Sequence, residues 1–230
     1  MTLYPSERNA RIMILKISAW MQERGYLKGN DACISCRVDP NQILTLATGV
    51  YKGYLDEDMI LKLSVDKGEV LYSFGSYTPS ADVEMHLRVF REYPMVYGTI
   101  NAQPPYATLC ALQPFPLVDA LTPSAVCHLG IVPLVHYAAP GSEELANAIA
   151  KACKGYNALL LENRGVLVWG ANLFETWQRL ETVEQYAFQT WMFAQADRKP
   201  SRLQRAEVEN LLKERERYCL YRGGAPCSRA

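Results

Sequence analysis

Side chains that could bind a metal or act as nucleophiles are few and scattered in this sequence. The 230 residues contain seven cysteines and three histidines. Cys33 and Cys36 form a single C-x-x-C pair, whereas a structural zinc site of this kind uses two such pairs. Residues three apart on a strand also face opposite sides of the sheet. We therefore interpret both residues as core thiols.

A nucleophile pair can be drawn from Cys127 and His128, with Asp119 to orient it. The surrounding residues 126–137 look extended, and neighbours on a strand point to opposite faces, which argues against the pair. His86, His128 and His136 are each interpreted as structural. With three histidines in the chain, a histidine-rich metal site is not expected.

The elements that carry these residues follow from apolar periodicity and turn signals. Helical spacing predicts helices over 8–25, 79–93, 106–112, 142–154, 173–196 and 202–217. Apolar runs between turns predict strands over 33–38, 43–48, 60–65, 70–74, 96–101, 158–162 and 166–169, with extended chain over 126–137. This order predicts an α/β fold with a largely antiparallel sheet, in one domain over 1–230 with a C-terminal helical tail over 198–230. The residues after Gly223 are expected to be flexible.

Five motifs, in order and spacing, resemble those of the class II aldolase and adducin family. They read GNDACISCR (29–37), TLATG (45–49), PSADVEMH (79–86), TINAQPPYAT (99–108) and ENRGVLVWG (162–170). The family counterparts are a glycine-rich turn leading to S-x-R, I-T-P-T/S-G, P-S-S-E followed by M-H, H-x-H, and N-H-G. The resemblance implies a three-layer fold, with a central, mostly antiparallel sheet covered by helices. It also implies a homotetramer with sites between adjacent subunits.

The zinc-binding histidines of that family are replaced here. The resemblance places the three imidazole ligands at Asn101, Gln103 and Arg164. Carboxamide oxygens are weak zinc ligands, and a guanidinium has no free lone pair to offer. The family's acid/base glutamate falls on Asp82, which we expect to pair with Arg164. No metal and no other cofactor is therefore expected.

The family's phosphate cradle is partly kept. Thr48, Gly49 and Ser80 match its positions, and the glycine-rich turn contributes Gly29. An ordinary turn and a helix cap are the alternative explanations for these residues. In the tail, Tyr218 resembles a tyrosine that acts as a proton donor in the neighbouring subunit's site. Asp82 and Tyr218 are thus the candidate catalytic residues.

Two functions are compatible with these substitutions. The first is a class II aldolase-like protein that has lost zinc-dependent aldol cleavage and keeps its fold and assembly as a structural, regulatory or ligand-binding member. The second is a sugar-phosphate aldolase or lyase of the fuculose-phosphate aldolase type with a non-standard site, in which Arg164 and Asp82 work without metal. The sequence leaves open whether the histidines were lost naturally or replaced deliberately.

The composition limits which classes of binding partner are expected. Lysine plus arginine and aspartate plus glutamate both number 24, so the net charge is zero and a nucleic-acid partner is not expected. No segment is long and apolar enough to suggest a membrane span, and the N-terminus lacks an apolar leader, so we expect a cytoplasmic protein. The expected partners are further copies of the chain and a phosphorylated sugar or other small anion.

Overall fold

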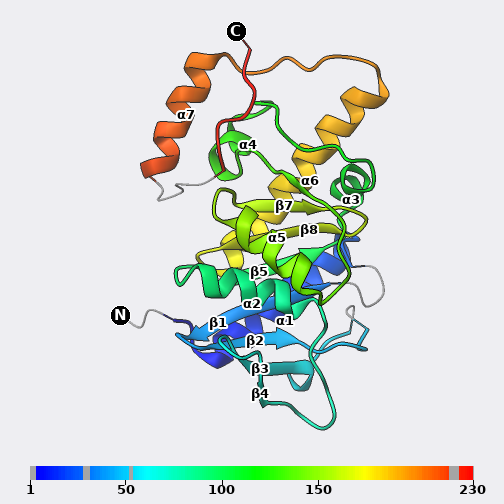
Figure 1. Cartoon of the computed structure of the whole chain (residues 1–230), viewed down its shortest axis with the longest axis vertical. Coiled ribbons are helices and arrows are strands. Elements are labelled where there is room, and N and C mark those ends of the chain that lie inside the picture. Colours follow the sequence, from blue (N-terminus) through cyan, green and yellow to red (C-terminus); the bar gives the residue numbers. More distant parts are fainter. Residues whose placement is uncertain (1–3, 28–31, 52–53, 218–222, 230) are drawn as a thin grey trace.

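A central eight-stranded sheet organises the fold. A computed structural model describes residues 4–27, 32–51, 54–217 and 223–229. Within them the strand order is β4-β3-β2-β1-β5-β8-β7-β6 (Figure 1). The strands are β1 Cys33–Asp39, β2 Gln42–Leu46, β3 Ile60–Ser64, β4 Val70–Tyr72, β5 Gly98–Ala102, β6 Leu134–Val135, β7 Ala158–Leu161 and β8 Gly165–Gly170. Neighbours pair antiparallel, apart from the parallel pair β6–β7. The predicted, largely antiparallel sheet is therefore confirmed.

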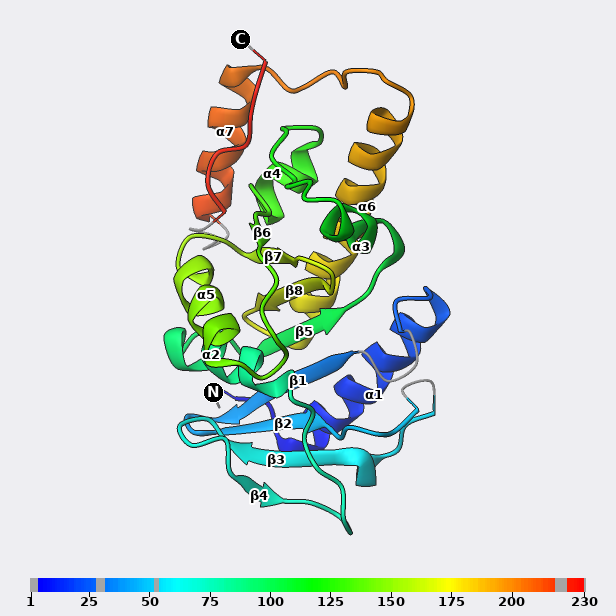
Figure 2. The ribbon, with the colours of Figure 1, turned by 45° about the vertical axis from the view of Figure 1, so that its right-hand side comes forward.

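Helices cover both faces of the sheet. They are α1 Glu7–Glu23, α2 Val83–Glu92, α3 Pro105–Leu112, α4 Pro123–His128, α5 Glu143–Cys153, α6 Leu173–Gln195 and α7 Arg205–Arg217, with a 3-10 turn η1 at Glu57–Met59. One hydrophobic core joins α1, α3 and α6 to the sheet, and a second joins α2 and α5 to its other face. Figure 2 shows α2 and α5 on one side of the strands and α1 and α6 on the other. This is the three-layer arrangement expected from the sequence.

Side-chain caps explain where several helices begin. Ser6, Ser142 and Asn172 each accept a hydrogen bond from a backbone N–H in the first turn of α1, α5 and α6. Such caps satisfy amide groups that have no partner inside the helix. The start predicted at Ser142 is confirmed.

Two local predictions are wrong. Residues 126–128 belong to α4 and not to an extended segment, because Thr122 caps a short helix that Pro123 starts. The helix predicted from Pro79 begins only at Val83, because Pro79 pairs with Ala47 and a turn that starts at Ser80 precedes α2. The expectation of a single domain over 1–230 stays a prediction.

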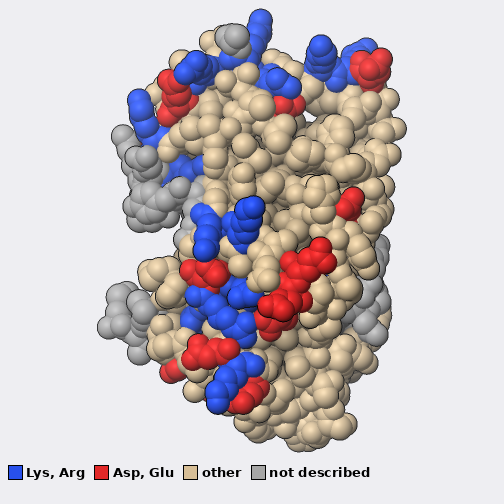
Figure 3. All heavy atoms as spheres, in the orientation of Figure 1, with Lys and Arg blue, Asp and Glu red and all other residues tan. Residues whose placement is uncertain are grey.

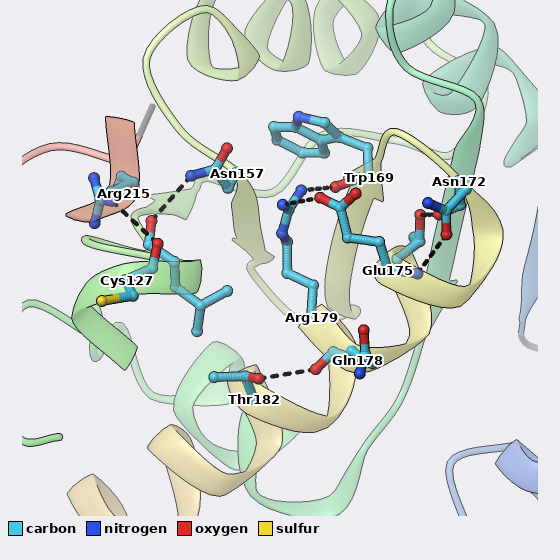
Figure 4. A network of polar contacts seen from close by, with 11 residues as sticks. Cys127, Asn157, Trp169, Asn172, Glu175, Gln178, Arg179, Thr182 and Arg215 are labelled. Atoms are coloured by element: carbon cyan, nitrogen blue, oxygen red, sulfur yellow. Dashed lines mark hydrogen bonds and ion pairs between the residues drawn. The ribbon is translucent and has the colours of Figure 1, made fainter. Parts of the chain in front are cut away.

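Residues 223–229 pack against the rest of the molecule, in contrast to the flexible segment expected after Gly223. Cys227 pairs with Asp119 and Arg229 with Gln204 through backbone bridges. Arg215, a buried residue of α7, donates to the backbone oxygens of Cys127 (3.2 Å), Val126 and Gly224 (3.2 Å). Figure 4 shows Arg215 reaching the end of α4 and, in the same view, a second buried arginine, Arg179, that contacts the Trp169 carbonyl.

Surface charges of both signs are mixed. On the face drawn in Figure 3, basic and acidic side chains alternate over the middle of the molecule, in keeping with a net charge of zero. The lower right of this view shows no charged side chain. In the described part of the chain, no helix is long and apolar enough to cross a membrane.

Candidate functional site

The residues at the family's metal positions meet where β5 ends and β8 begins. Asn101 lies in β5 and Gln103 directly follows it. Arg164 lies in the turn between β7 and β8, and β8 pairs antiparallel with β5 so that Val166 faces Ala102. Asp82 precedes α2, on the layer above. Three segments distant in sequence thus converge on one place.

A glycine allows the Arg164 turn to sit against β5. Gly165 has a φ of +120°, and a Cβ added there would lie 2.3 Å from the Ala102 carbonyl oxygen. A side chain at this position would therefore clash with backbone. Asn163 has a φ of 59°, the left-handed conformation that asparagine tolerates better than most residues. The turn is fixed by backbone geometry, and Arg164 with it.

Asp82 is held by two donors. The Arg164 guanidinium contacts Asp82 Oδ1, and the two side chains are 17% and 15% exposed. Asn101 Nδ2 donates to Asp82 Oδ2 at 3.0 Å. Both carboxylate oxygens are thus engaged. The pairing of Asp82 with Arg164 expected from the sequence is present.

These residues line a cavity of about 220 Å³. Its lining comprises Asp82, Asn101, Gln103, Tyr137, Pro140, Asn163 and Arg164. The resemblance pointed to four of them, and the N-R-G motif contained Asn163. Tyr137 and Pro140 lie in a loop without a recognised motif, so sequence reasoning missed them.

The loop that carries Tyr137 is tied to the end of β7. Glu162 Oε2 accepts from the Tyr137 backbone N–H at 2.8 Å and contacts His136 Nδ1 at 3.3 Å. The Tyr137 hydrogen bond lowers the pKa of the Glu162 carboxyl. His136 is exposed and supports this loop, in agreement with its structural interpretation.

The donor set does not fit a zinc ion. The Asn101 side-chain oxygen lies 3.0 Å from His86 Nε2, and its amide nitrogen faces Asp82, so Asn101 presents N–H groups to the carboxylate. Arg164 adds a cation where a metal would need a lone pair. Across the described residues, no three histidine, cysteine, aspartate or glutamate side chains are grouped closely enough to hold a metal.

A buried chain of polar contacts continues behind the cavity. His86 has no exposed surface, and its Nδ1 lies 2.8 Å from Ser35 Oγ. Ser35 Oγ lies 2.8 Å from Thr45 Oγ1, which Cys33 Sγ approaches at 3.2 Å. Burial lowers the pKa of His86 to about 4, so the ring is neutral at neutral pH. The sequence indicated a core hydrogen bond for His86 but not its link to the site.

The turns of the expected phosphate cradle lie side by side. Thr48 N donates to the Thr78 carbonyl at 2.9 Å, and Ala47 pairs with Pro79. Thr48 and Gly49 are exposed, and Gly49 has a φ of 72°. Ser80 Oγ accepts from the Asp82 backbone N–H at 3.2 Å, which joins the cradle to the cavity. Gly29 and Tyr218 lie outside the described residues.

Among the described residues, Cys33, Cys36 and Cys127 form no reactive pair. Cys33 faces Thr45, whereas Cys36 packs in the core on the α1 side, so the two face opposite sides of β1 as predicted. Cys127 and His128 lie in a helix and not a strand, so the earlier reason for rejecting them was wrong. Cys127 Sγ instead approaches the Leu211 carbonyl at 3.7 Å, toward α7.

A family comparison agrees with this geometry. The model of the Class II Aldolase and Adducin N-terminal domain matches residues 13–191. The chain belongs to the class II aldolase and adducin family. The family expected from the five motifs is thereby confirmed.

Relatives within the class II aldolase family carry lyase names. The chain is 33% identical over 198 residues to the 3-oxo-tetronate 4-phosphate decarboxylase of Pectobacterium atrosepticum, covering 84% of this chain and 88% of that protein. An Escherichia coli K12 protein of the same name is 29% identical over 185 residues, covering 79% and 85%.

Solved structures give the same fold. YgbL from Escherichia coli superposes with a TM-score of 0.81 at 29% identity, covering 89% of this chain and 98% of that chain. An L-fuculose 1-phosphate aldolase superposes with a TM-score of 0.81 at 26% identity, covering 94% and 100%. The class II aldolase fold is therefore confirmed.

Proposed function

We propose that this class II aldolase family member binds a small phosphorylated sugar derivative in the Asp82–Arg164 cavity and does not perform zinc-dependent aldol cleavage. The observation that carries the proposal is the Asp82 carboxylate, which accepts from the Arg164 guanidinium and the Asn101 amide. A cation and an N–H donor therefore occupy the position where the family's chemistry requires a metal.

Aldol cleavage needs an electrophile. Breaking the C–C bond of a ketose phosphate leaves an enediolate, whose charge a metal stabilises while a carboxylate moves the protons. Here the Arg164 charge is paired with Asp82, and both Asp82 oxygens already accept hydrogen bonds. The cavity and the neighbouring turns at Thr48 and Ser80 instead offer N–H and O–H donors, which suit the oxygens of an anionic ligand.

A second candidate is a metal-independent lyase. It is favoured by the 33% identity to a protein named 3-oxo-tetronate 4-phosphate decarboxylase. In a 3-oxo acid, the bond to the carboxylate carbon breaks, CO₂ leaves, and the electron pair passes to the ketone oxygen as an enolate, which then takes up a proton. Arg164 would stabilise that oxyanion, provided that substrate displaced it from Asp82.

The two candidates are separated by one pair of measurements on chelator-treated protein. Calorimetry with erythronate 4-phosphate tests binding, and CO₂ release from 3-oxo-tetronate 4-phosphate tests turnover, with and without added zinc. Binding without turnover supports the ligand-binding function, and chelator-resistant turnover supports the lyase. Turnover that requires zinc would overturn both, and failure to bind either compound would exclude a phosphosugar ligand. Arg164→Met is the matched variant, and it should bind erythronate 4-phosphate at least about tenfold more weakly because it loses a charged donor.

We also propose a homo-oligomer, a tetramer by resemblance, in the cytoplasm. Support for association comes from the edge strand β4, where Val70, Leu71 and Tyr72 are 45–53% exposed. Exposed apolar side chains on an unpaired strand edge favour association with another chain. The cytoplasmic location and the absence of a nucleic-acid or membrane partner rest on the sequence alone.

A further inference from the structure

The number of protons available for hydrogen bonding limits the chain of contacts that runs from Asp82 into the core. Asp82 Oδ2 lies 3.0 Å from Asn101 Nδ2, Asn101 Oδ1 lies 3.0 Å from His86 Nε2, and His86 Nδ1 lies 2.8 Å from Ser35 Oγ. A neutral imidazole has one N–H and one acceptor nitrogen, a hydroxyl has one proton, and an amide has a donor side and an acceptor side. Each contact therefore fixes the direction of the next.

Two arrangements satisfy this count. In the first, Ser35 turns its one proton from Thr45 Oγ1 to His86 Nδ1, His86 Nε2–H donates to the Asn101 oxygen, and Asn101 donates to Asp82. In the second, every direction is reversed: His86 Nδ1–H donates to Ser35, Ser35 donates to Thr45 Oγ1 at 2.8 Å, and a turned Asn101 amide donates to His86 Nε2. The hydroxyl of Thr45 then points away from Ser35, toward Cys33 Sγ at 3.2 Å.

The charge of Asp82 selects between the two. The second arrangement places the Asn101 oxygen against an Asp82 oxygen, which is repulsive unless a proton lies between them. Arg164, in the β7–β8 turn, is the cationic group in contact with Asp82, and its N–H groups suit a carboxylate oxygen. The first arrangement therefore accompanies a charged Asp82, and the second accompanies a neutral hydrogen-bond donor at that position.

Burial limits this chain of hydrogen bonds, called the relay below (Asp82, Asn101, His86, Ser35 and Thr45), to the two arrangements. His86, on α2, is fully buried against β1 and β5, and burial lowers its pKa to about 4, so the ring is neutral at neutral pH and cannot donate on both sides. An unpaired polar atom in such a place is costly, so mixed arrangements are disfavoured. The groups facing the ring are Ser35 from β1 and Asn101 from β5, both uncharged.

We propose that His86 is a positioning residue whose tautomer depends, through Asn101, on whether position 82 accepts or donates a hydrogen bond. Every hydrogen bond of the relay would reverse its direction when position 82 is a neutral donor. The proposal deepens the proposed function, and it rests on that function only where it assigns a purpose: the relay keeps an N–H donor on the carboxylate that pairs with Arg164. If the protein is a lyase, Asn101 would turn and His86 would change its tautomer each time Asp82 takes up a proton.

The ring nitrogens of His86 report the arrangement directly. With three histidines in the chain, ¹⁵N-histidine labelling gives a simple two-bond ¹H–¹⁵N spectrum, and His128→Gln and His136→Gln assign it. At pH 7.5 we expect the Nε2–H tautomer at His86 in the wild-type protein and the Nδ1–H tautomer in Asp82→Asn. An amide at position 82 can face Asn101 with its NH₂ group, which imitates a neutral Asp82.

Arg164→Gln is the matched control. It removes the other partner of Asp82 but leaves a carboxylate that still accepts from the Asn101 amide, so the wild-type tautomer should persist. An Nδ1–H tautomer in the wild type would overturn the proposal without any variant, and so would one tautomer shared by the wild type and a folded Asp82→Asn. These spectra need no ligand. A failure of the ligand proposal would leave them unchanged, and a failure of the relay would leave the calorimetric result standing.

Discussion

At the scale of single residues, the Arg164–Asp82 pair sets the stability of the site. Both side chains are more than four-fifths buried, and the carboxylate has Asn101 as its second donor. Arg164→Met leaves a poorly solvated carboxylate with one partner, so we expect the free energy of unfolding to fall by about 2 kcal/mol. Urea denaturation measures it. Arg205→Met removes an exposed ion pair and should change stability by less than about 0.5 kcal/mol, and equal losses in the two variants would contradict the buried role of Arg164.

His86 gives the protein a predictable response to acid. Its pKa falls from an ordinary 6.5 to about 4 because the folded ring is buried. Above pH 6.5 the ring is neutral in both states and contributes no pH dependence. As the pH falls from 6.5 toward 4, the unfolded chain takes up a proton that the folded chain refuses, so this group lowers the free energy of unfolding by roughly 3 kcal/mol over the window.

Urea denaturation at pH 7.5, 6.5, 5.5 and 4.5 tests this response. His86→Gln should be less stable than the wild type at pH 7.5, yet lose less further stability on acidification. His136→Gln alters an exposed histidine and should keep the wild-type pH dependence. Parallel curves for His86→Gln and the wild type would show that His86 is not the titrating group.

Motif matching located the site residues but not their connections. Residue type and motif order were enough to identify four site residues, because each could be matched to a position in a family motif. They are Asp82, Asn101, Gln103 and Arg164. Two features were out of reach. Tyr137 enters the cavity only because Glu162 ties its loop to β7, and His86 reaches the site only through the contact of α2 with β1 and β5. Both depend on packing between segments distant in sequence.

At the scale of elements, the β7–β8 turn positions Arg164. Gly165→Ala would place a methyl group 2.3 Å from the Ala102 carbonyl oxygen, at a φ that side chains rarely adopt. We expect a loss of at least about 2 kcal/mol in unfolding free energy, measured in urea, and weaker binding of erythronate 4-phosphate because Arg164 moves. Gly155→Ala is the control, since a Cβ there meets nothing within 4 Å, and it should be neutral or slightly stabilising. Similar effects of the two alanines would argue against a steric requirement at Gly165.

Element prediction succeeded where the signal is local and failed where it is not. Strands β1, β2, β7 and β8 and the long helix α6 follow directly from apolar periodicity between turn residues. Helix α4 was missed because six residues are too few for a helical period to show, and its cap at Thr122 and its contact with α7 stabilise it instead. The start of α2 was placed four residues early because Pro79 suits a turn as well as a first helical turn.

At the scale of the whole molecule, Arg215 anchors the C-terminal segment. It links α7 to the end of α4 and to Gly224 through three backbone oxygens. In Arg215→Met these oxygens lose a charged donor, so residues 223–229 should be cleaved faster in limited proteolysis followed by mass spectrometry, with about 2 kcal/mol lower global stability. Lys213→Met, on an exposed position of the same helix, should be cleaved at the wild-type rate. Unchanged cleavage in Arg215→Met would show that other contacts hold the segment.

The apolar edge at β4 bears on assembly. Leu71 and Tyr72 are 50% and 53% exposed, and a lone chain gains nothing from leaving them in water. We expect light scattering on a size-exclusion column to give a multiple of 25.9 kDa for the wild type and a smaller mass for Leu71→Lys/Tyr72→Lys, because two charges would be buried at the contact. Glu69→Lys changes the charge beside this edge without removing apolar surface, so it should keep the wild-type mass. A wild-type mass of 25.9 kDa would refute the oligomer, whereas a double variant that keeps the wild-type multiple would place the contact on another face.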